Sequence, residues 1–374
     1  MIKVLTIIGT RPEAIKMAPV IRALNQTKGP INSAVLNSRQ HDVYLVKDTL
    51  DLFKCQIDWS LSVLEPGRDL AQLSASLLQN ISNVLKVLKP DFVFVHGDTT
   101  TAMNAALAAY YNRIPIGHVE AGLRSSRFET PFPEEMNRQI IARLASIHFA
   151  PTQKAARNLY DEGVSSNRVF VTGNTIVDAL QYVLKNTNPN YNNVFPGGRD
   201  LILVTCHRRE SWGVNIQKLC ETIRRLSIER ENYFFVWPVH PNPELQKTVR
   251  HALSGLHNVR VTDPFTYQQM VWLLNVVDLV ITDSGGVLEE AAVLGRSTLV
   301  LREVTERPEA LELPGIELVG YDFDLLAKRT KDILFRPPQE FKSDAFGYGD
   351  AGEQIVDLLL ANFDQIKVDH GRNS

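Results

Sequence analysis

Short apolar runs alternate with longer amphipathic stretches along almost the whole chain. Runs such as residues 3–8 and 92–95 have the length of buried strands. Residues 70–88 instead place leucine, isoleucine and valine side chains on one face of a helix. Strands that alternate with helices in this way predict βαβ units around a parallel sheet, which is an α/β fold.

The same pattern gives a set of expected elements in each half of the chain. Strands are predicted at residues 3–8, 33–36, 92–95, 115–119, 148–150 and 169–171, and then at 201–204, 233–236, 259–261, 279–282 and 297–301. Helices are predicted at residues 13–25, 43–53, 70–88, 101–111, 134–146 and 175–184, and then at 215–226, 243–253, 267–274, 287–294 and 350–363.

The chain of 374 residues is long enough for two domains. Residues 185–199 are rich in asparagine, proline and glycine, which predicts the main loop between the halves. We therefore expect a first Rossmann-like domain over 1–175, with the C-terminal segment 351–368 packing back on it, and a second over 176–350. Two such domains are expected to face each other across a cleft where the carboxyl ends of their strands meet.

Composition narrows the class of protein. Hydrophobic residues make up 44% of the chain, and the net charge of −2 gives no general attraction to nucleic acid or to an anionic membrane. The three cysteines form neither a disulfide framework nor a metal-binding spacing, and no run is long enough to span a bilayer. These features predict a cytoplasmic protein with no nucleic-acid or membrane partner and no bound metal.

Residues 281–295, ITDSGGVLEEAAVLG, are the most informative stretch. Two glycines where a strand turns into a helix let the backbone approach a ligand, and the start of the helix favours phosphate. Glu289 and Glu290, one turn later, have the chemistry to bind ribose hydroxyls. A nucleotide site is one reading, and a tight turn with a solvated acidic face explains the same residues equally well.

Polar residues follow the ends of many predicted strands, so they are expected on one rim of each sheet. They are Thr10, Arg11, Lys16, His96, Asp98, Glu120, Arg124, Glu134 and Glu135 in the first half, and His207, Arg208, Arg209, Glu210, His240, Asn242, Ser284 to Glu290 and Thr305 to Glu309 in the second. Several have a structural alternative. Asp98 could be a helix cap, Glu134 could serve the helix dipole, and a structural role is favoured for His240.

A group of longer motifs resembles the non-hydrolysing UDP-N-acetylglucosamine 2-epimerase family, in the right order over nearly the whole chain. The motifs are GTRPEAIKMAP, VHGDTTT, HVEAGLR, PFPEEMNR, VTGNT-x-x-DAL, VTCHRRESWG, PVHPNP, TDSGG-x-x-EEA and TERPEA. The resemblance implies a glycosyltransferase-B fold, a UDP-sugar substrate, a homodimer and no cofactor.

The resemblance also implies roles for individual residues. The essential carboxylates fall on Asp98, Glu120 and Glu134, and the site histidine falls on His207. The contacts to the UDP-sugar fall on Arg11, Lys16, His240, Ser284, Gly285, Gly286, Glu290 and Arg307. We expect this set to eliminate UDP across C1–C2 of the sugar and to add it back after C2 is reprotonated on the other face.

The segment that binds an activating second UDP-N-acetylglucosamine in some family members departs from their pattern here. Asp42 and Val43 stand where those members often have a cation and a polar residue. Only Gln40, His41, Glu135 and Arg208 could remain from that modulator site, so we expect weak activation or none.

Three other functions fit parts of the pattern. The first is a hydrolysing epimerase that releases N-acetylmannosamine and UDP, and the second is a glycosyltransferase of the same fold. The third is a UDP-sugar binding protein without catalysis.

Overall fold

The computed structural model describes residues 1–27, 29, 31–38, 43–61, 69–125, 127, 129–187, 197–206, 212–335 and 343–369. The chain divides into two compact units, Met1–Tyr182 with Phe346–Ser374, and Val183–Ala345. The first crossing between units therefore lies inside helix α7 (Thr175–Asn186), and the second lies shortly before helix α14 (Ala351–Asp369).

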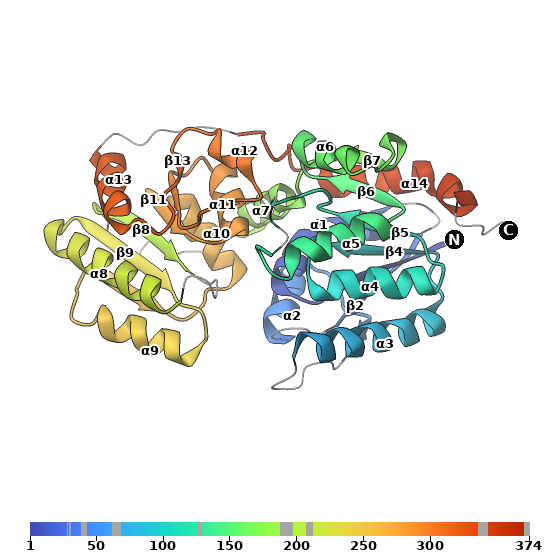
Figure 1. Ribbon diagram of the computed structural model, residues 1–374, viewed down its shortest axis with the longest axis horizontal. Helices are drawn as coiled ribbons and strands as arrows, with labels where there is room; N and C mark the ends of the chain where they lie inside the picture. Colours follow the sequence, from blue (N-terminus) through green and yellow to red (C-terminus); the bar gives the residue numbers. More distant parts are fainter. Residues whose placement is uncertain are drawn as a thin grey trace. The chain divides into compact units, whose positions relative to one another are not determined.

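The first unit is built on a seven-stranded, all-parallel sheet (Figure 1), in the order β3-β2-β1-β4-β5-β6-β7. Its strands are β1 (Ile2–Ile8), β2 (Ile31–Asn37), β3 (Trp59–Ser60), β4 (Phe92–His96), β5 (Ile116–Val119), β6 (Ile147–Ala150) and β7 (Val169–Val171). The residues of β4, β5 and β6 are all buried, as expected for parallel strands covered on both faces.

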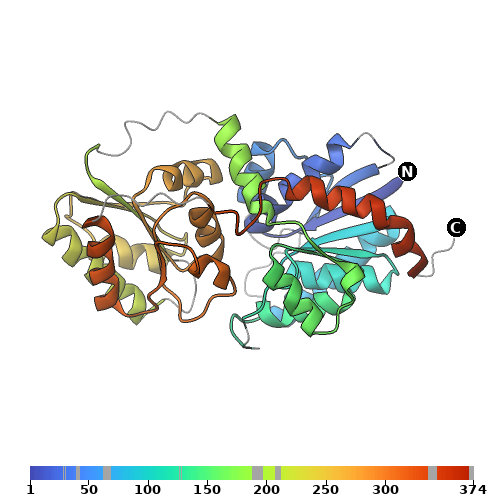
Figure 2. The same ribbon diagram turned by 90° about the horizontal axis from the view of Figure 1, so that it is seen from above.

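Helices cover this sheet in two groups. They are α1 (Arg11–Gln26), α2 (Val43–Leu52), α3 (Leu70–Leu88), α4 (Thr100–Tyr111), α5 (Glu134–Leu144), α6 (Gln153–Asp161), the short 3₁₀ helix η1 (Ser166–Arg168), α7 and α14. Helix α4 packs between α3 and α5, whereas α1 packs against α2 and α14. In Figure 2 the last helix, α14, lies along this unit although it comes from the end of the chain.

The second unit repeats the design with a six-stranded parallel sheet in the order β10-β9-β8-β11-β12-β13. Its strands are β8 (Asp200–Thr205), β9 (Tyr233–Pro238), β10 (Val259–Thr262), β11 (Leu279–Thr282), β12 (Thr298–Val300) and β13 (Ile316–Leu318). Its helices are α8 (Val214–Glu229), α9 (Pro243–Ala252), α10 (Tyr267–Val276), α11 (Gly285–Val293), α12 (Pro308–Leu311) and α13 (Phe323–Phe335). Buried side chains of β8, β9 and β11 form the centre of its core, with Trp237 the largest fully buried one.

Local sequence signals explain where several helices begin. Thr10 caps α1 by accepting a hydrogen bond from the Glu13 N–H, and Pro12 occupies the first turn, where its missing N–H costs nothing. Asp69 and Gln72 form a reciprocal capping box at the start of α3. These caps fix the point at which each strand-to-helix turn ends.

Each sheet has a position where the strand order reverses. It lies between β1 and β4 in the first unit and between β8 and β11 in the second. In doubly wound sheets, ligands bind beyond the carboxyl ends of the strands at this position. The residues that follow β1, β4, β8 and β11 are therefore the first place to look for a site.

Candidate active site

Glu120 is the most constrained of the predicted site residues in the first unit. It follows β5 directly and has a positive φ of 61°, in the left-handed region that costs a non-glycine residue about 1–2 kcal/mol. Its Oε1 accepts a hydrogen bond from Nζ of Lys16 at 2.7 Å, and its Oε2 lies 3.0 Å from Nε2 of His96. All three side chains are nearly buried. The fold thus accepts local strain and places this carboxylate between two basic groups.

Glu13 lies beside this group and ties two turns together. Its side chain is buried and accepts hydrogen bonds from the Gly9 N–H at 3.0 Å, the Thr10 hydroxyl at 2.8 Å and the Thr99 hydroxyl at 2.7 Å. Burial raises the pKa of the Glu13 carboxyl above its usual value, while the hydrogen bonds from Thr99 and Thr10 and the charge of His96 oppose that shift. Glu13 thereby fixes the turn after β1 relative to the turn after β4.

Asp98 is held by a second buried cation. Its side chain is partly exposed and forms an ion pair with the guanidinium of Arg138, which is 3% exposed, while its backbone carbonyl accepts a hydrogen bond from Nδ2 of Asn137 at 2.8 Å. The cap of α4 is Thr99 and not Asp98, because the Thr99 hydroxyl accepts the Ala102 N–H. The structural alternative considered for Asp98 is therefore wrong.

Glu134 and Glu135 open helix α5, directly after the two cis peptide bonds Thr130–Pro131 and Phe132–Pro133. Glu134 is partly buried. Glu135 is 1% exposed, and its Oε2 accepts hydrogen bonds from the Ser125 N–H at 3.0 Å and from Nη1 of Arg138 at 2.8 Å. The Glu135 carboxylate thus stabilises the buried interior of the first unit.

In the second unit, the predicted phosphate-binding turn is the first turn of a helix. Gly285 and Gly286 are the first two residues of α11, whereas the sequence placed them in the preceding turn. Ser284 is the N-cap, and its hydroxyl accepts the Val287 N–H at 3.4 Å. The expected bounds of this helix were wrong, because a serine cap allows the helix to begin at glycine.

Arg307 lies against the Gly285 backbone so closely that any side chain at position 285 would collide with the guanidinium. Arg307 forms ion pairs with Glu289 and, at 2.9 Å, with Glu306, and Glu306 also pairs with Arg302 at 2.6 Å. All four side chains are nearly buried. This network of ion pairs fixes the Arg307 guanidinium against the backbone of Gly285.

The remaining predicted residues fall into two groups. Arg11 is the first residue of α1, Glu290 is 5% exposed on α11, and His240 follows β9, where its Nδ1 accepts the Asn242 N–H at 3.2 Å. The other group, Gln40, His41, His207 and Arg208, lies outside the described residues.

The structure therefore brings some of the predicted residues together, in one cluster in each unit. Lys16 joins Glu120 in the first, and Ser284, Gly285 and Arg307 join in the second. The sequence pattern did not single out His96, Glu13 or Arg138 as site residues, and Glu289, expected as a ribose ligand, instead forms an ion pair with Arg307. His96 stood in the strand-end pattern, and Arg138 could have been found from its helical spacing of three from Glu135.

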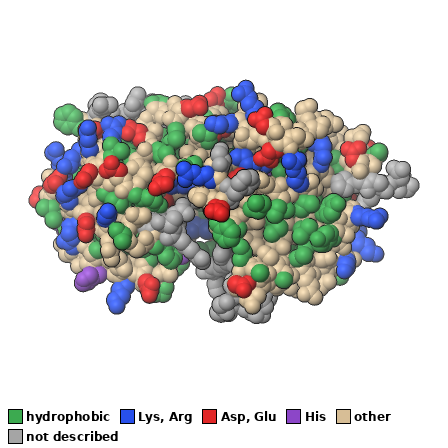
Figure 3. All heavy atoms as spheres, in the orientation of Figure 1, with side chains coloured by type: hydrophobic (Ala, Val, Ile, Leu, Met, Phe, Trp, Pro, Cys, Tyr) green, Lys and Arg blue, Asp and Glu red, His purple; other side chains and the backbone are tan. Residues whose placement is uncertain are grey.

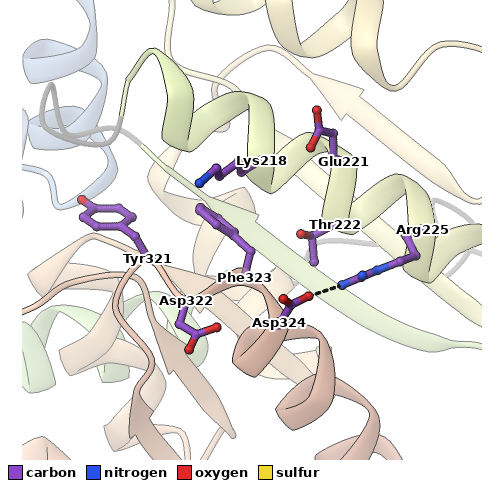
Figure 4. Close-up of a pocket in the computed structure, with 8 residues that line it drawn as sticks. All are labelled: Lys218, Glu221, Thr222, Arg225, Tyr321, Asp322, Phe323 and Asp324. Carbon is purple, nitrogen blue, oxygen red and sulfur yellow. Dashed lines mark hydrogen bonds and ion pairs between the residues drawn. The ribbon is translucent and has the colours of Figure 1, made fainter.

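The second unit also contains a pocket of about 440 Å³ that none of the predicted site residues lines (Figure 4). Residues of α8, of the turn before α13 and of the first turn of α13 form it. Arg225 and Asp324 approach to 3.3 Å on its wall, and Lys218 and Tyr321 lie toward its other end. Among the residues described, no group of His, Cys, Asp or Glu side chains is arranged to hold a metal ion. No helix in the described part of the chain is long and apolar enough to cross a membrane.

Comparisons with known proteins agree over nearly the full length. The family model for UDP-N-acetylglucosamine 2-epimerase matches residues 22–360. The UDP-N-acetylglucosamine 2-epimerase of Escherichia coli (strain K12) is 39% identical over 375 residues, which cover 96% of this chain and 99% of that protein. The crystal structure of UDP-GlcNAc 2-epimerase from Neisseria meningitidis bound to UDP-GlcNAc superimposes with a TM-score of 0.92 at 38% identity, covering 96% of this chain and 100% of that one.

A more distant structure, MurG of Acinetobacter baumannii, shares only the fold, with 15% identity and a TM-score of 0.58 over 96% of this chain and 100% of that one. Two Rossmann-like units and these structural relatives establish the glycosyltransferase-B fold. The family model matches most of the chain. A relative that is 39% identical is also covered over almost its whole length. Together these two findings establish the family. The chain belongs to the UDP-N-acetylglucosamine 2-epimerase family of isomerases.

Proposed function

We propose that this protein is a non-hydrolysing UDP-N-acetylglucosamine 2-epimerase, which interconverts UDP-N-acetylglucosamine and UDP-N-acetylmannosamine. The observation that carries the proposal is the buried carboxylate of Glu120 between Lys16 and His96, in a member of this family. A buried carboxylate that accepts a hydrogen bond from a lysine and lies close to a histidine, directly after a strand, is suited to proton transfer.

The chemistry follows from the weak acidity of the C2 proton. Direct removal of that proton would leave an unstabilised carbanion. If the C1–O bond breaks as the proton leaves, UDP departs with the electron pair and a C1–C2 double bond forms, giving a 2-acetamidoglucal. UDP then adds back to C1 while C2 receives a proton on the opposite face, so that the configuration at C2 is inverted. Every atom of the substrate is retained, and neither an oxidant nor water is consumed.

The first unit supplies the acid–base groups in this proposal. Asp98, Glu120 and Glu134 form the pool from which the base and the acid are drawn. Two ion pairs support it, because Arg138 holds the Asp98 carboxylate and Lys16 holds the Glu120 carboxylate in a fixed position. Two carboxylates that act on opposite faces of the ring are the simplest arrangement for inversion at C2.

The second unit supplies the nucleotide site. The N–H groups at the start of α11, around Ser284, Gly285 and Gly286, are suited to bind the diphosphate, and Glu290 is suited to bind the ribose. Arg11, Lys16, His207, His240 and Arg307 complete the proposed contacts and stabilise the charge that develops on the departing UDP. Lys16 and Arg307 would act partly through the carboxylates with which they pair.

The protein is also proposed to act as a cytoplasmic homodimer. Hydrophobic side chains gather over α4 on the face shown in Figure 3, and Tyr110 and Tyr111 at the end of this helix are 55% and 64% exposed. An apolar helix surface of this kind is suited to self-association. Light scattering coupled to size-exclusion chromatography measures the mass in solution, and a monomer at micromolar concentration would contradict this part of the proposal.

Proton NMR of the reaction in D₂O tests the epimerase assignment. Incubation with UDP-N-acetylglucosamine should replace the C2 proton by deuterium in both UDP-sugars. The summed amount of the two UDP-sugars should stay constant. Free N-acetylmannosamine in amounts equal to UDP would instead show a hydrolysing enzyme. Retention of the C2 proton, with sugar transferred to an added acceptor, would show a glycosyltransferase.

A further inference from the structure

The turn that carries Asp98 is held by hydrogen bonds from other elements of the first unit. Gly97 follows β4 directly and has a positive φ of 64°. Its N–H donates to the Val119 carbonyl at 2.9 Å, and its own carbonyl lies 2.8 Å from Nε2 of His118. Both polar groups of the Gly97 backbone are therefore bound by consecutive residues of β5, the strand that leads into Glu120.

His118 acts as the hydrogen-bond donor in this contact. A backbone carbonyl only accepts hydrogen bonds, so the proton of the neutral imidazole lies on Nε2. The side chain is fully buried, and burial lowers the pKa of His118 from 6.5 to about 4, which keeps the ring neutral near pH 7. His118 thus holds the Gly97 carbonyl without adding a charge near the Asp98 carboxylate.

Asn137 of α5 holds the next peptide unit in the same way. Its side chain is buried, and its Nδ2 donates to the Asp98 carbonyl at 2.8 Å. The carbonyls before and after the Asp98 Cα atom are therefore each bound by a neutral, buried donor. Because a peptide unit is planar, fixing both units fixes φ and ψ of Asp98, and with them the direction of its Cα–Cβ bond. The ion pair with Arg138 then fixes the end of the side chain.

We propose that His118 and Asn137 are positioning residues that orient the Asp98 carboxylate for proton transfer. Both bind backbone carbonyls of the turn, so they act on the carboxylate through the backbone. Transfer depends steeply on geometry, and a displacement of about 1 Å can lower the rate by a factor of about 100. This inference rests on the proposed function, because Asp98 belongs to its acid–base pool.

The first test removes each donor from the full-length protein. We expect Asn137→Leu and His118→Leu each to lower kcat by roughly tenfold to a hundredfold, with KM and the dissociation constant for UDP little changed. His118→Gln should keep most of the activity that His118→Leu loses, because the glutamine amide can still donate to the Gly97 carbonyl. Equal losses in the two His118 variants would contradict the role of this hydrogen bond.

Asn104→Leu is the matched control for Asn137→Leu. Asn104 is also a buried asparagine of the first unit that donates to a backbone carbonyl, that of Thr100 at 2.8 Å. Its variant should keep the kcat of the wild type. A loss of kcat in Asn104→Leu as large as that in Asn137→Leu would show that any buried asparagine has this effect, and would overturn the inference.

The Asp98→Asn background separates positioning from a purely structural role. If Asn137 acts through the Asp98 carboxylate, Asn137→Leu should lower kcat by no more than about twofold once that carboxylate is gone. A structural role would instead lower kcat by the same factor in both backgrounds, and that result would overturn the inference. Deuterium exchange at C2, followed by NMR, measures these rates, and circular dichroism shows whether each variant is folded.

The outcomes for the inference and for the proposed function are distinct. Should His118→Leu fail to fold, Asn137→Leu and Asn137→Ala, which both remove the donor to the Asp98 carbonyl, decide the question. Unchanged kcat in the folded variants, beside an active wild type, would overturn the inference and leave the proposed function standing. A wild type that exchanges no C2 proton in D₂O would refute the proposed function, and the inference would fall with it.

Discussion

Lys16 and Glu120 are 104 positions apart in the chain, yet Nζ of Lys16 lies 2.7 Å from Oε1 of Glu120. Both side chains are 6% exposed, so each charge depends on the other for compensation. The pair joins helix α1 to the strained turn after β5. The position of the Glu120 carboxylate is therefore set by a helix from a distant part of the sequence.

A double-mutant cycle measures this dependence. Lys16→Met should lower the free energy of unfolding by about 3–5 kcal/mol, because it leaves a buried carboxylate without its cation. Glu120→Gln made in the Lys16→Met background should cost much less than it does in the wild type. Urea unfolding of the four proteins gives the coupling, which we expect to exceed about 1 kcal/mol. Strictly additive effects would show that the two residues are independent.

Asp98→Asn should lower kcat by roughly a hundredfold or more, since the amide cannot act as a base. Folding and UDP binding should be largely kept, because the amide oxygen can still accept a hydrogen bond from Arg138. Turnover assays and calorimetric titration with UDP provide the measurements. Arg138→Lys is the companion variant: it keeps the charge but cannot pair with Asp98 and Glu135 together, so an intermediate kcat is expected. Near-normal turnover of Asp98→Asn would remove Asp98 from the pool.

The sequence was sufficient for most of the architecture. Strands such as β4, β5 and β11 are short apolar runs between turn residues, and Asp98, Glu120 and Ser284 follow the ends of these strands as the pattern predicted. The alternation of strands and helices then predicted a doubly wound parallel sheet in each half.

Other features could not be found in the sequence pattern. Strand β3 has two exposed residues, and helix α12 has four residues, so neither gives a periodic signal. Strand β13 was also missed. Helices α6 and α13 were missed too, although their buried positions repeat at helical spacing and so did give a signal. The pairing of Arg138 with Asp98 and of Lys16 with Glu120 depends on how distant segments pack, which propensity and spacing do not encode.

Two paired histidines should make the protein sensitive to acid. His118 and His148 face each other on β5 and β6, and burial lowers the pKa of His118 from 6.5 to about 4 and that of His148 well below 6.5. The folded state therefore disfavours protonation of both histidines. Their effect leaves the free energy of unfolding unchanged above pH 6.5 and lowers it as the pH falls below 6.5. For His118 the loss by about pH 4 is on the order of 3 kcal/mol.

Asp178 acts with the opposite sign, because burial raises its pKa from 3.8 to about 6 and its contribution grows as pH falls through that range. The comparison must therefore be made between variants. His148→Leu, which removes one group that resists protonation, should lose less unfolding free energy than the wild type between pH 7.5 and 5. Urea unfolding at several pH values is the measurement. Equal losses in the two proteins would mean that His148 does not contribute.

Activation by a second substrate molecule should be weak or absent. Asp42 and Val43 interrupt the expected modulator segment, and the Glu135 carboxylate is engaged by Ser125 and Arg138 inside the first unit. Initial rates measured against UDP-N-acetylglucosamine concentration should follow a hyperbola. In the reverse direction, traces of UDP-N-acetylglucosamine should not accelerate the reaction of UDP-N-acetylmannosamine. A clearly sigmoidal rate curve would contradict the prediction.

In the proposed elimination, the C1–O bond breaks and re-forms while UDP and the 2-acetamidoglucal are both bound to the enzyme. Positional isotope exchange detects this event, with UDP-N-acetylglucosamine that carries ¹⁸O in the bridge between C1 and phosphorus. Free rotation of the β-phosphate in the bound UDP should move ¹⁸O into non-bridging positions of the recovered UDP-sugars, which ³¹P NMR detects. Inversion at C2 with all ¹⁸O still in the bridge would contradict the elimination mechanism.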